Sequence, residues 1–187
     1  IVAALNGTLP VVFMHMVSYE RARAPMLNAS PHDHVGAKWT EPDCALLNRI
    51  CRLIVKVFTG IAGIWLLLAA TAGTFVILEP ASRTGLGAEA WLAWAVFSVG
   101  AACRIVQQGY ISYILGSGEI APVRRLEAMS WFAGAAGALL VLWLAPSFLG
   151  AVALLQLPQA LNIFLLARMA KRLGWTPADS KTHDAGL

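Results

Sequence analysis

The stretch that decides the fold is Val57–Leu78, VFTGIAGIWLLLAATAGTFVIL, which contains no charged residue. A helix needs about 20 apolar residues to cross the ~30 Å hydrocarbon core of a bilayer, and this stretch is long enough. Four further apolar stretches flank it, at residues 1–19, 90–113, 128–145 and 148–167. The sequence therefore predicts an all-α integral membrane protein with about five transmembrane helices.

The 14 Lys and Arg residues are sorted between alternate connections of these helices. Six lie in residues 20–56, two in 114–127 and four after residue 167, whereas the other two loops hold only Arg83. The last one, Arg104, lies inside an apolar stretch. Because cytoplasmic loops carry the excess of Lys and Arg, the sequence predicts a cytoplasmic C-terminus.

The composition agrees with a membrane location and argues against nucleic-acid binding. Hydrophobic residues make up 58% of the chain and charged residues 13%, about half of the ~25% that is typical of soluble domains. The net charge of +4 follows from the basic cytoplasmic loops, which also attract anionic lipid headgroups. No basic run is interleaved with aromatic residues as a single-strand binder would require. The bilayer is the expected partner.

The predicted organisation is a helical bundle over residues 1–173 followed by a cytoplasmic tail, 174–187. The cytoplasmic connection 20–56 ends in an amphipathic lead-in helix, 43–56, which is expected to lie at the membrane interface before the span 57–78. Its apolar residues recur at helical spacing: Leu46, Leu47, Ile50, Leu53 and Ile54. Since the chain opens inside an apolar stretch without Met, we expect it to be the C-terminal part of a larger transporter.

The residue with the strongest functional signal is Arg104. A charge this deep in a membrane costs ~2.5–3.5 kcal/mol on insertion scales and usually faces a bundle interior or an aqueous cavity. Gln107 and Gln108 follow at the spacing of one helix face, and Gly100 precedes them on it. One interpretation is a cavity wall on which Arg104 binds a phosphate. The other is a structural partner on another helix, or a side chain that snorkels to the interface.

A second polar stripe lies in the last apolar stretch and is uncharged. Its spacing of three residues places its members on one helix face, either bonded to a neighbouring helix or lining a cavity. The members are Gln156, Gln159 and Asn162.

The sequence offers no catalytic, metal or cofactor site. His32-Asp33-His34 lacks a third ligand with suitable spacing, and Cys44, Cys51 and Cys103 show no metal spacing. No nucleophile or acid–base pair is evident, so the chain is predicted not to be an enzyme.

Three segments resemble a known family. Leu5–Pro10 (LNGTLP), Gln107–Gly118 (QQGYISYILGSG) and the turn Pro146–Ala151 (PSFLGA) are similar to helices and turns of the polysaccharide and O-antigen flippases. These proteins belong to the multidrug/oligosaccharidyl-lipid/polysaccharide exporter superfamily, with twelve or more helices in two halves. The resemblance implies that this chain is most of the second half.

The resemblance also implies a function. Such a protein moves an anionic lipid-linked oligosaccharide across the bacterial inner membrane through a central basic cavity, beside other surface-polysaccharide assembly proteins. Only Arg104 carries over from the family, by its position, and no cofactor is implied.

Other functions remain open at the level of sequence. A drug or cation exporter of the same fold would be expected to carry an intramembrane carboxylate, and the five stretches contain none. A non-transport assembly subunit for surface polysaccharides is the second alternative. A membrane enzyme is the third, with its acidic and His residues in the connection 20–48.

Overall fold

The computed structural model of the chain describes residues 2–21, 44–84 and 87–173. These ranges are helical apart from short turns and contain no β-strand. In chain order the elements are α1 (Val2–Arg21), α2 (Cys44–Leu68), the π-helical turn η1 (Ala69–Gly73), α3 (Thr74–Thr84), α4 (Ala88–Gly116), α5 (Ile120–Leu144) and α6 (Phe148–Arg172).

Four helical stretches in these ranges are long and apolar enough to cross a membrane. They are Leu46–Glu79, Ala88–Gly116, Ile120–Leu144 and Phe148–Arg172. They contain the predicted spans 57–78, 90–113 and 148–167, and all of the span 128–145 except its last residue, Ala145. The first predicted span, 1–19, is helical as α1 but is not among the four. The prediction of an all-α, multi-pass membrane protein is confirmed.

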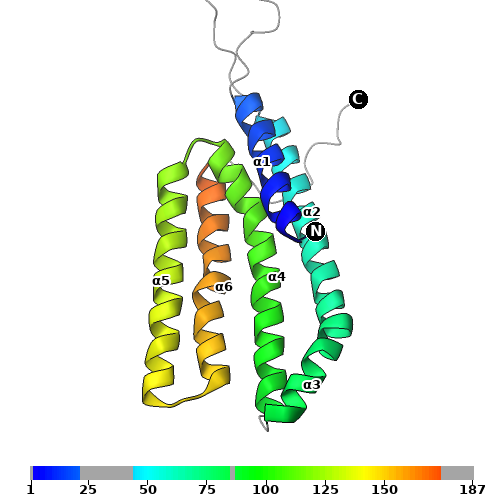
Figure 1. Cartoon of the computed structure of the whole chain (residues 1–187). Helices are drawn as coiled ribbons and strands as arrows, with labels where there is room; N and C mark the ends of the chain where they lie inside the picture. The colour runs from blue at the N-terminus through cyan, green and yellow to red at the C-terminus, as the bar shows by residue number, and fades with distance from the viewer. Residues whose placement is uncertain (1, 22–43, 85–86, 174–187) are drawn as a thin grey trace, which may run out of the picture.

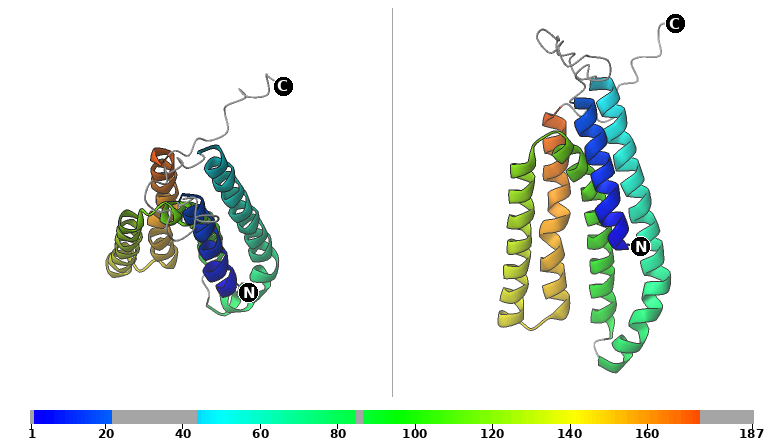
Figure 2. Two further views of the ribbon diagram at one scale, coloured as in Figure 1. Left: turned by 90° about the horizontal axis from the view of Figure 1, so that it is seen from above. Right: turned by 45° about the horizontal axis from the view of Figure 1, so that its top comes forward.

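The helices are arranged around α4. On one side α4 packs on α2 and α1, and on the other it packs on α6, while α5 packs mainly on α6 (Figures 1 and 2). The α5–α6 hairpin is closed by Ala145, Pro146 and Ser147, a turn too short to allow anything but antiparallel neighbours.

The predicted lead-in helix, 43–56, and the first part of the predicted span, 57–78, belong to one helix. From Cys44 to Leu68 the chain forms one uninterrupted helix. Leu47, Cys51 and Ile54 are buried at helical spacing, and Phe58 continues the same stripe into the span. Because one face packs into the core across residue 56, nothing interrupts the helix there.

The core lies at one end of the bundle, where five helices meet. It joins the end of α1, the first half of α2, the end of α4, the start of α5 and the end of α6 (Figure 1). Its members are Val17, Leu47, Cys51, Ile54, Phe58, Tyr110, Ile111, Tyr113, Ile114, Val123, Leu166 and Ala170.

The connections alternate between the two ends of the bundle. The end of α1, the start of α2, the α4–α5 connection and the end of α6 lie at the core end, whereas the end of α3 and the α5–α6 turn lie at the other (Figure 1). Among the described residues, most Lys and Arg side chains are in helix segments at the core end, whereas Arg83 is in the last turn of α3 at the other end. The two-sided sorting of charge in the sequence therefore corresponds to two ends of the structure.

A glycine allows α1 to approach α4 closely. A Cβ atom on Gly116 would lie 2.7 Å from Cβ of Val17 and 2.8 Å from the carbonyl oxygen of Met14. Ser18 Oγ donates a hydrogen bond of 3.2 Å to the Gly116 carbonyl. Small residues let membrane helices approach in this way, so Gly116 fixes the position of α1.

At the opposite end, Glu89 ties α4 to the α5–α6 turn. Its Oε1 accepts hydrogen bonds from the Leu149 amide at 3.0 Å and from Ser147 Oγ at 3.1 Å. Ser147 is also the N-cap of α6 and accepts from the Gly150 amide at 3.1 Å. A carboxylate at a helix N-terminus is electrostatically favourable, so this contact stabilises both the cap and the packing of α6 beside α4.

Candidate functional site

The polar residues singled out in the sequence lie on α4 and α6, and the structure divides them into two groups. Gln107, Gln159 and Asn162 are buried between helices, whereas Arg104 is exposed on the surface of the bundle. Gln108 and Gln156 are half-buried. The six residues therefore do not form one continuous cavity wall.

Arg104 contacts an aromatic ring of the neighbouring hairpin. Its guanidinium carbon lies 4.4 Å from the ring centroid of Trp131 on α5, which is a cation–π geometry. In the described ranges no carboxylate forms an ion pair with it. Trp131 was not identified from the sequence, because an aromatic residue on another helix becomes a candidate only when the two helices are placed side by side.

The contact with Trp131 does not offset the cost of placing a charge at this depth. Arg104 is 16 residues after the start of α4 and 12 before its end, or about 24 Å and 18 Å at ~1.5 Å per residue. The insertion cost is ~2.5–3.5 kcal/mol, against ~0.5–1 kcal/mol for an exposed cation–π pair and about 2 for a desolvated one. The guanidinium therefore needs water or an anion in addition to the ring.

Gln107 and Gln159 join α4 to α6. The Gln107 side-chain amide donates a hydrogen bond to the backbone carbonyl of Gln159, and both residues are buried. Nε2 of Gln159 is buried without a hydrogen-bond partner among the described residues, as is Oγ of Ser98 on α4. Gln107 thus bonds between helices, and the Gln159 amide leaves an unused donor at the α4–α6 contact.

Asn162 joins α6 to α5. Its Nδ2 donates to Ser130 Oγ at 2.6 Å, and Ser130 Oγ in turn donates to the Leu126 carbonyl at 2.7 Å. In this structure the Asn162 side chain is hydrogen-bonded to the neighbouring helix and is not directed at a cavity. On α4 the Gln108 carbonyl accepts from Ser112 Oγ at 2.6 Å.

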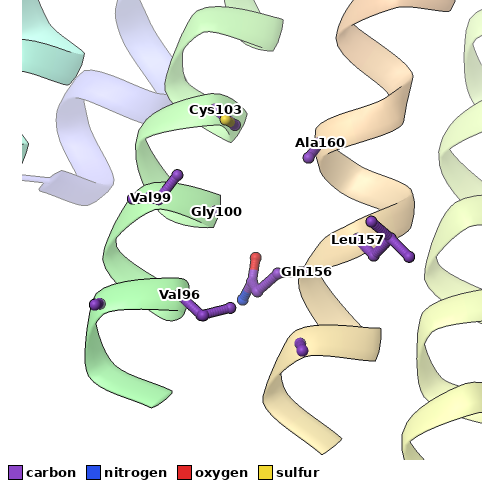
Figure 3. A pocket seen from close by; sticks show the side chains of 9 residues that line it. Val96, Val99, Gly100, Cys103, Gln156, Leu157 and Ala160 are labelled. Carbon is purple, nitrogen blue, oxygen red and sulfur yellow. The ribbon is translucent and has the colours of Figure 1, made fainter. Parts of the chain in front are cut away.

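Gln156 lines an apolar pocket between α4 and α6. The pocket has a volume of about 390 Å³, and its other lining residues, including Val96, Val99 and Cys103, are apolar or weakly polar (Figure 3). Gln156 reaches from α6 toward α4, and Gly100 leaves the space for it, because a Cβ there would lie 2.7 Å from the amide carbon (Figure 3). Such a pocket suits an apolar chain better than a charged group.

The remaining sequence candidates divide between described and undescribed residues. His32-Asp33-His34 lies outside the described residues. Within the described ranges, no group of three His, Cys, Asp or Glu side chains could hold a metal ion. Cys51 is a free, buried cysteine in the core, and Cys103 is a free cysteine beside the apolar pocket.

Comparison of the chain with protein-family models, curated proteins and solved structures finds no match.

Proposed function

We propose that the chain is part of a flippase-like transporter that moves an anionic lipid-linked oligosaccharide across the bacterial inner membrane. The observation that supports this best is Arg104, an exposed cation near the middle of a membrane helix that forms no ion pair within the described residues. A phosphate of the cargo would supply the missing anion, because guanidinium binds phosphate through two parallel hydrogen bonds.

The apolar pocket is consistent with a lipid-linked cargo. Two of its residues, Gly100 and Cys103, lie within about one turn of Arg104 on α4. A cargo with a phosphate and a long hydrocarbon chain could place the phosphate at Arg104 and part of the chain between α4 and α6. A free sugar phosphate would leave the pocket unused.

A drug or cation exporter fits the described residues less well. Such a protein needs a carboxylate within the membrane to bind the cation. Of the acidic residues in the described ranges, Glu20, Glu89 and Glu119 are at helix ends, Glu79 is in the short helix α3, and Glu127 is in the third turn of α5, where it pairs with Arg124.

The test of this proposal is deletion and complementation of the full-length gene. Deletion is expected to abolish surface glycan and to leave the lipid-linked oligosaccharide in the cytoplasmic leaflet, where only enzymes added to inside-out vesicles can reach its sugar. The intact gene should restore export. If deletion leaves no completed lipid-linked oligosaccharide at all, the protein acts in synthesis or assembly and the proposal is wrong.

The orientation that we propose has the core end of the bundle and the C-terminus in the cytoplasm. In a variant without the native cysteines, Pro146→Cys should react in intact cells with a membrane-impermeant thiol reagent, because this exposed residue is in the α5–α6 turn. Glu119→Cys, also exposed but in the α4–α5 connection, should react only after the cells are opened. The reverse pattern would contradict the orientation.

A further inference from the structure

A groove lined by three arginines lies between the first turns of α5 and the last turns of α6. Its volume is about 530 Å³, and Arg125, Arg168 and Arg172 line it. All three are exposed, and none forms an ion pair with a carboxylate in the described part of the chain. The neighbouring Arg124 differs, because its guanidinium donates to Glu127 at 2.8 Å. Three cations therefore share one groove, and no described carboxylate pairs with them.

The helix dipoles account for only part of this arrangement. Arg172 is in the last turn of α6, where the negative end of the dipole favours a cation by about 0.3–1 kcal/mol, whereas Arg168 is one turn further in, where this effect has fallen off. Arg125 is the sixth residue of α5, near the end that favours anions instead. Arg125 therefore gains nothing from the dipole and shares the groove with two other cations, so an anion in the groove would relieve the repulsion among the three.

The groove changes from charged to apolar along its length. Arg172 is the last residue of α6, and Leu165 lies seven residues, or about 10 Å, deeper in the span. On α5, Met129 lies four residues deeper than Arg125. Met129 is 70% exposed and Leu165 47% exposed, so the deep part of the groove presents an apolar surface. Cations at the helix ends and an apolar floor below them match the polarity of a lipid molecule.

We propose that this groove binds an anionic glycerophospholipid of the bilayer, with its phosphate on the three arginines and an acyl chain along Met129 and Leu165. Basic pockets between membrane helices on the cytoplasmic side bind anionic lipid headgroups in this way. A soluble anion would use the arginines but not the apolar floor. The site is separate from Arg104 and does not depend on the transport function.

The experiment is native mass spectrometry of the purified full-length protein in mild detergent. It compares dioleoyl phosphatidylglycerol with dioleoyl phosphatidylcholine, which have the same acyl chains. The wild type should bind phosphatidylglycerol more tightly. The variant R125Q/R168Q/R172Q should lose this preference, with an affinity lower on the order of 100-fold, since each basic residue near the surface contributes the equivalent of roughly a fivefold effect.

A matched control removes the same number of charges elsewhere. The variant R49Q/K56Q/K171Q replaces three exposed basic residues that do not line the groove and should keep the preference. Met129→Trp keeps every charge but fills the apolar floor, and it should also weaken binding. Because Met129 is exposed, this variant remains informative if the triple arginine variant does not fold.

Three results would overturn the proposal. Equal loss in both triple variants would show general attraction to a basic surface without a site. Equal binding of the two lipids by the wild type would show that no anion is selected. Displacement of phosphatidylglycerol by an equimolar amount of undecaprenyl phosphate would show that the groove takes a polyprenyl carrier instead of a glycerophospholipid.

Discussion

Replacing Arg104 with Gln is expected to lower glycan export by roughly 10- to 100-fold while the protein remains in the membrane. A hydrogen bond to a charged group contributes about 1.5–3 kcal/mol, and each 1.4 kcal/mol is a factor of ten. Insertion should not suffer, because the substitution removes a charge that is costly at this depth. The measurement is export of surface glycan in the complementation assay, normalised to the amount of protein in the membrane.

Further variants test whether the effect comes from the positive charge of Arg104 alone or also from the shape of its guanidinium group. Arg104→Lys should recover only part of the activity, because an ammonium group cannot form the two parallel bonds of guanidinium. Trp131→Ala should cost less, about two- to fivefold, since an exposed cation–π contact contributes only ~0.5–1 kcal/mol. Arg83→Gln is the matched control: the same substitution at an exposed arginine at the other end of the bundle, where it pairs with Glu79.

Two outcomes would contradict this assignment. Full activity of Arg104→Gln at normal protein levels would show that the charge takes no part in transport. Loss of the protein from the membrane would show that Arg104 stabilises the fold through an ion pair. The partner carboxylate would then lie outside the described residues or on another chain.

Hydropathy predicted the helical membrane architecture correctly, because the bilayer requires every spanning segment to be long, apolar and internally hydrogen-bonded. Hydropathy did not indicate that the lead-in and the span form one continuous helix, for a physical reason. Arg49, Arg52 and Lys56 lower the mean hydropathy of the first half of this helix. The stripe from Leu47 to Phe58 still packs into the core, and helix continuity follows from that packing.

The site was less predictable, because its contacts are between residues that are far apart in the sequence. The spacing placed Gln107 and Gln159 each on a polar helix face, but only the packing of α4 against α6 shows that Gln107 bonds to the Gln159 backbone. Nothing in the sequence pairs Arg104 with Trp131 or Asn162 with Ser130. The helix face on which a residue lies can be predicted from local periodicity, whereas the residue that it contacts on another helix depends on the register between the two helices.

The basic groove illustrates the same limit. In the sequence, Arg125, Arg168 and Arg172 indicate only that their segments are expected on the cytoplasmic side. The antiparallel α5–α6 hairpin brings the start of one helix beside the end of the other, so residues more than 40 positions apart line one groove. The charge pattern therefore gives an expected side of the membrane for these arginines, but it does not indicate that they share a groove.

The second large effect is expected at the contact between α1 and α4. Gly116→Ala should lower the stability of the protein by about 1–3 kcal/mol, the usual cost of overpacking, because the new methyl group would meet the α1 backbone at Met14 as well as Val17. Flexible side chains could yield to a methyl group, but the carbonyl of Met14 moves only if α1 moves. Gly116→Val should be worse and should detach α1 from the core.

Gly60→Ala is the matched control for this prediction. Gly60 is in the middle of α2 and has no atom within 4 Å of a Cβ built on it, so the same methyl group meets no described neighbour. Since Ala is favoured over Gly in a helix interior by up to about 1 kcal/mol, this variant should be neutral or slightly more stable.

The measurement is the thermal unfolding midpoint of the purified full-length protein in one detergent. A midpoint for Gly116→Ala equal to or above that of Gly60→Ala would show that α1 does not pack on α4 as the structure has it. The core formed by Val17, Tyr113 and Ile114 would then have to be assigned differently.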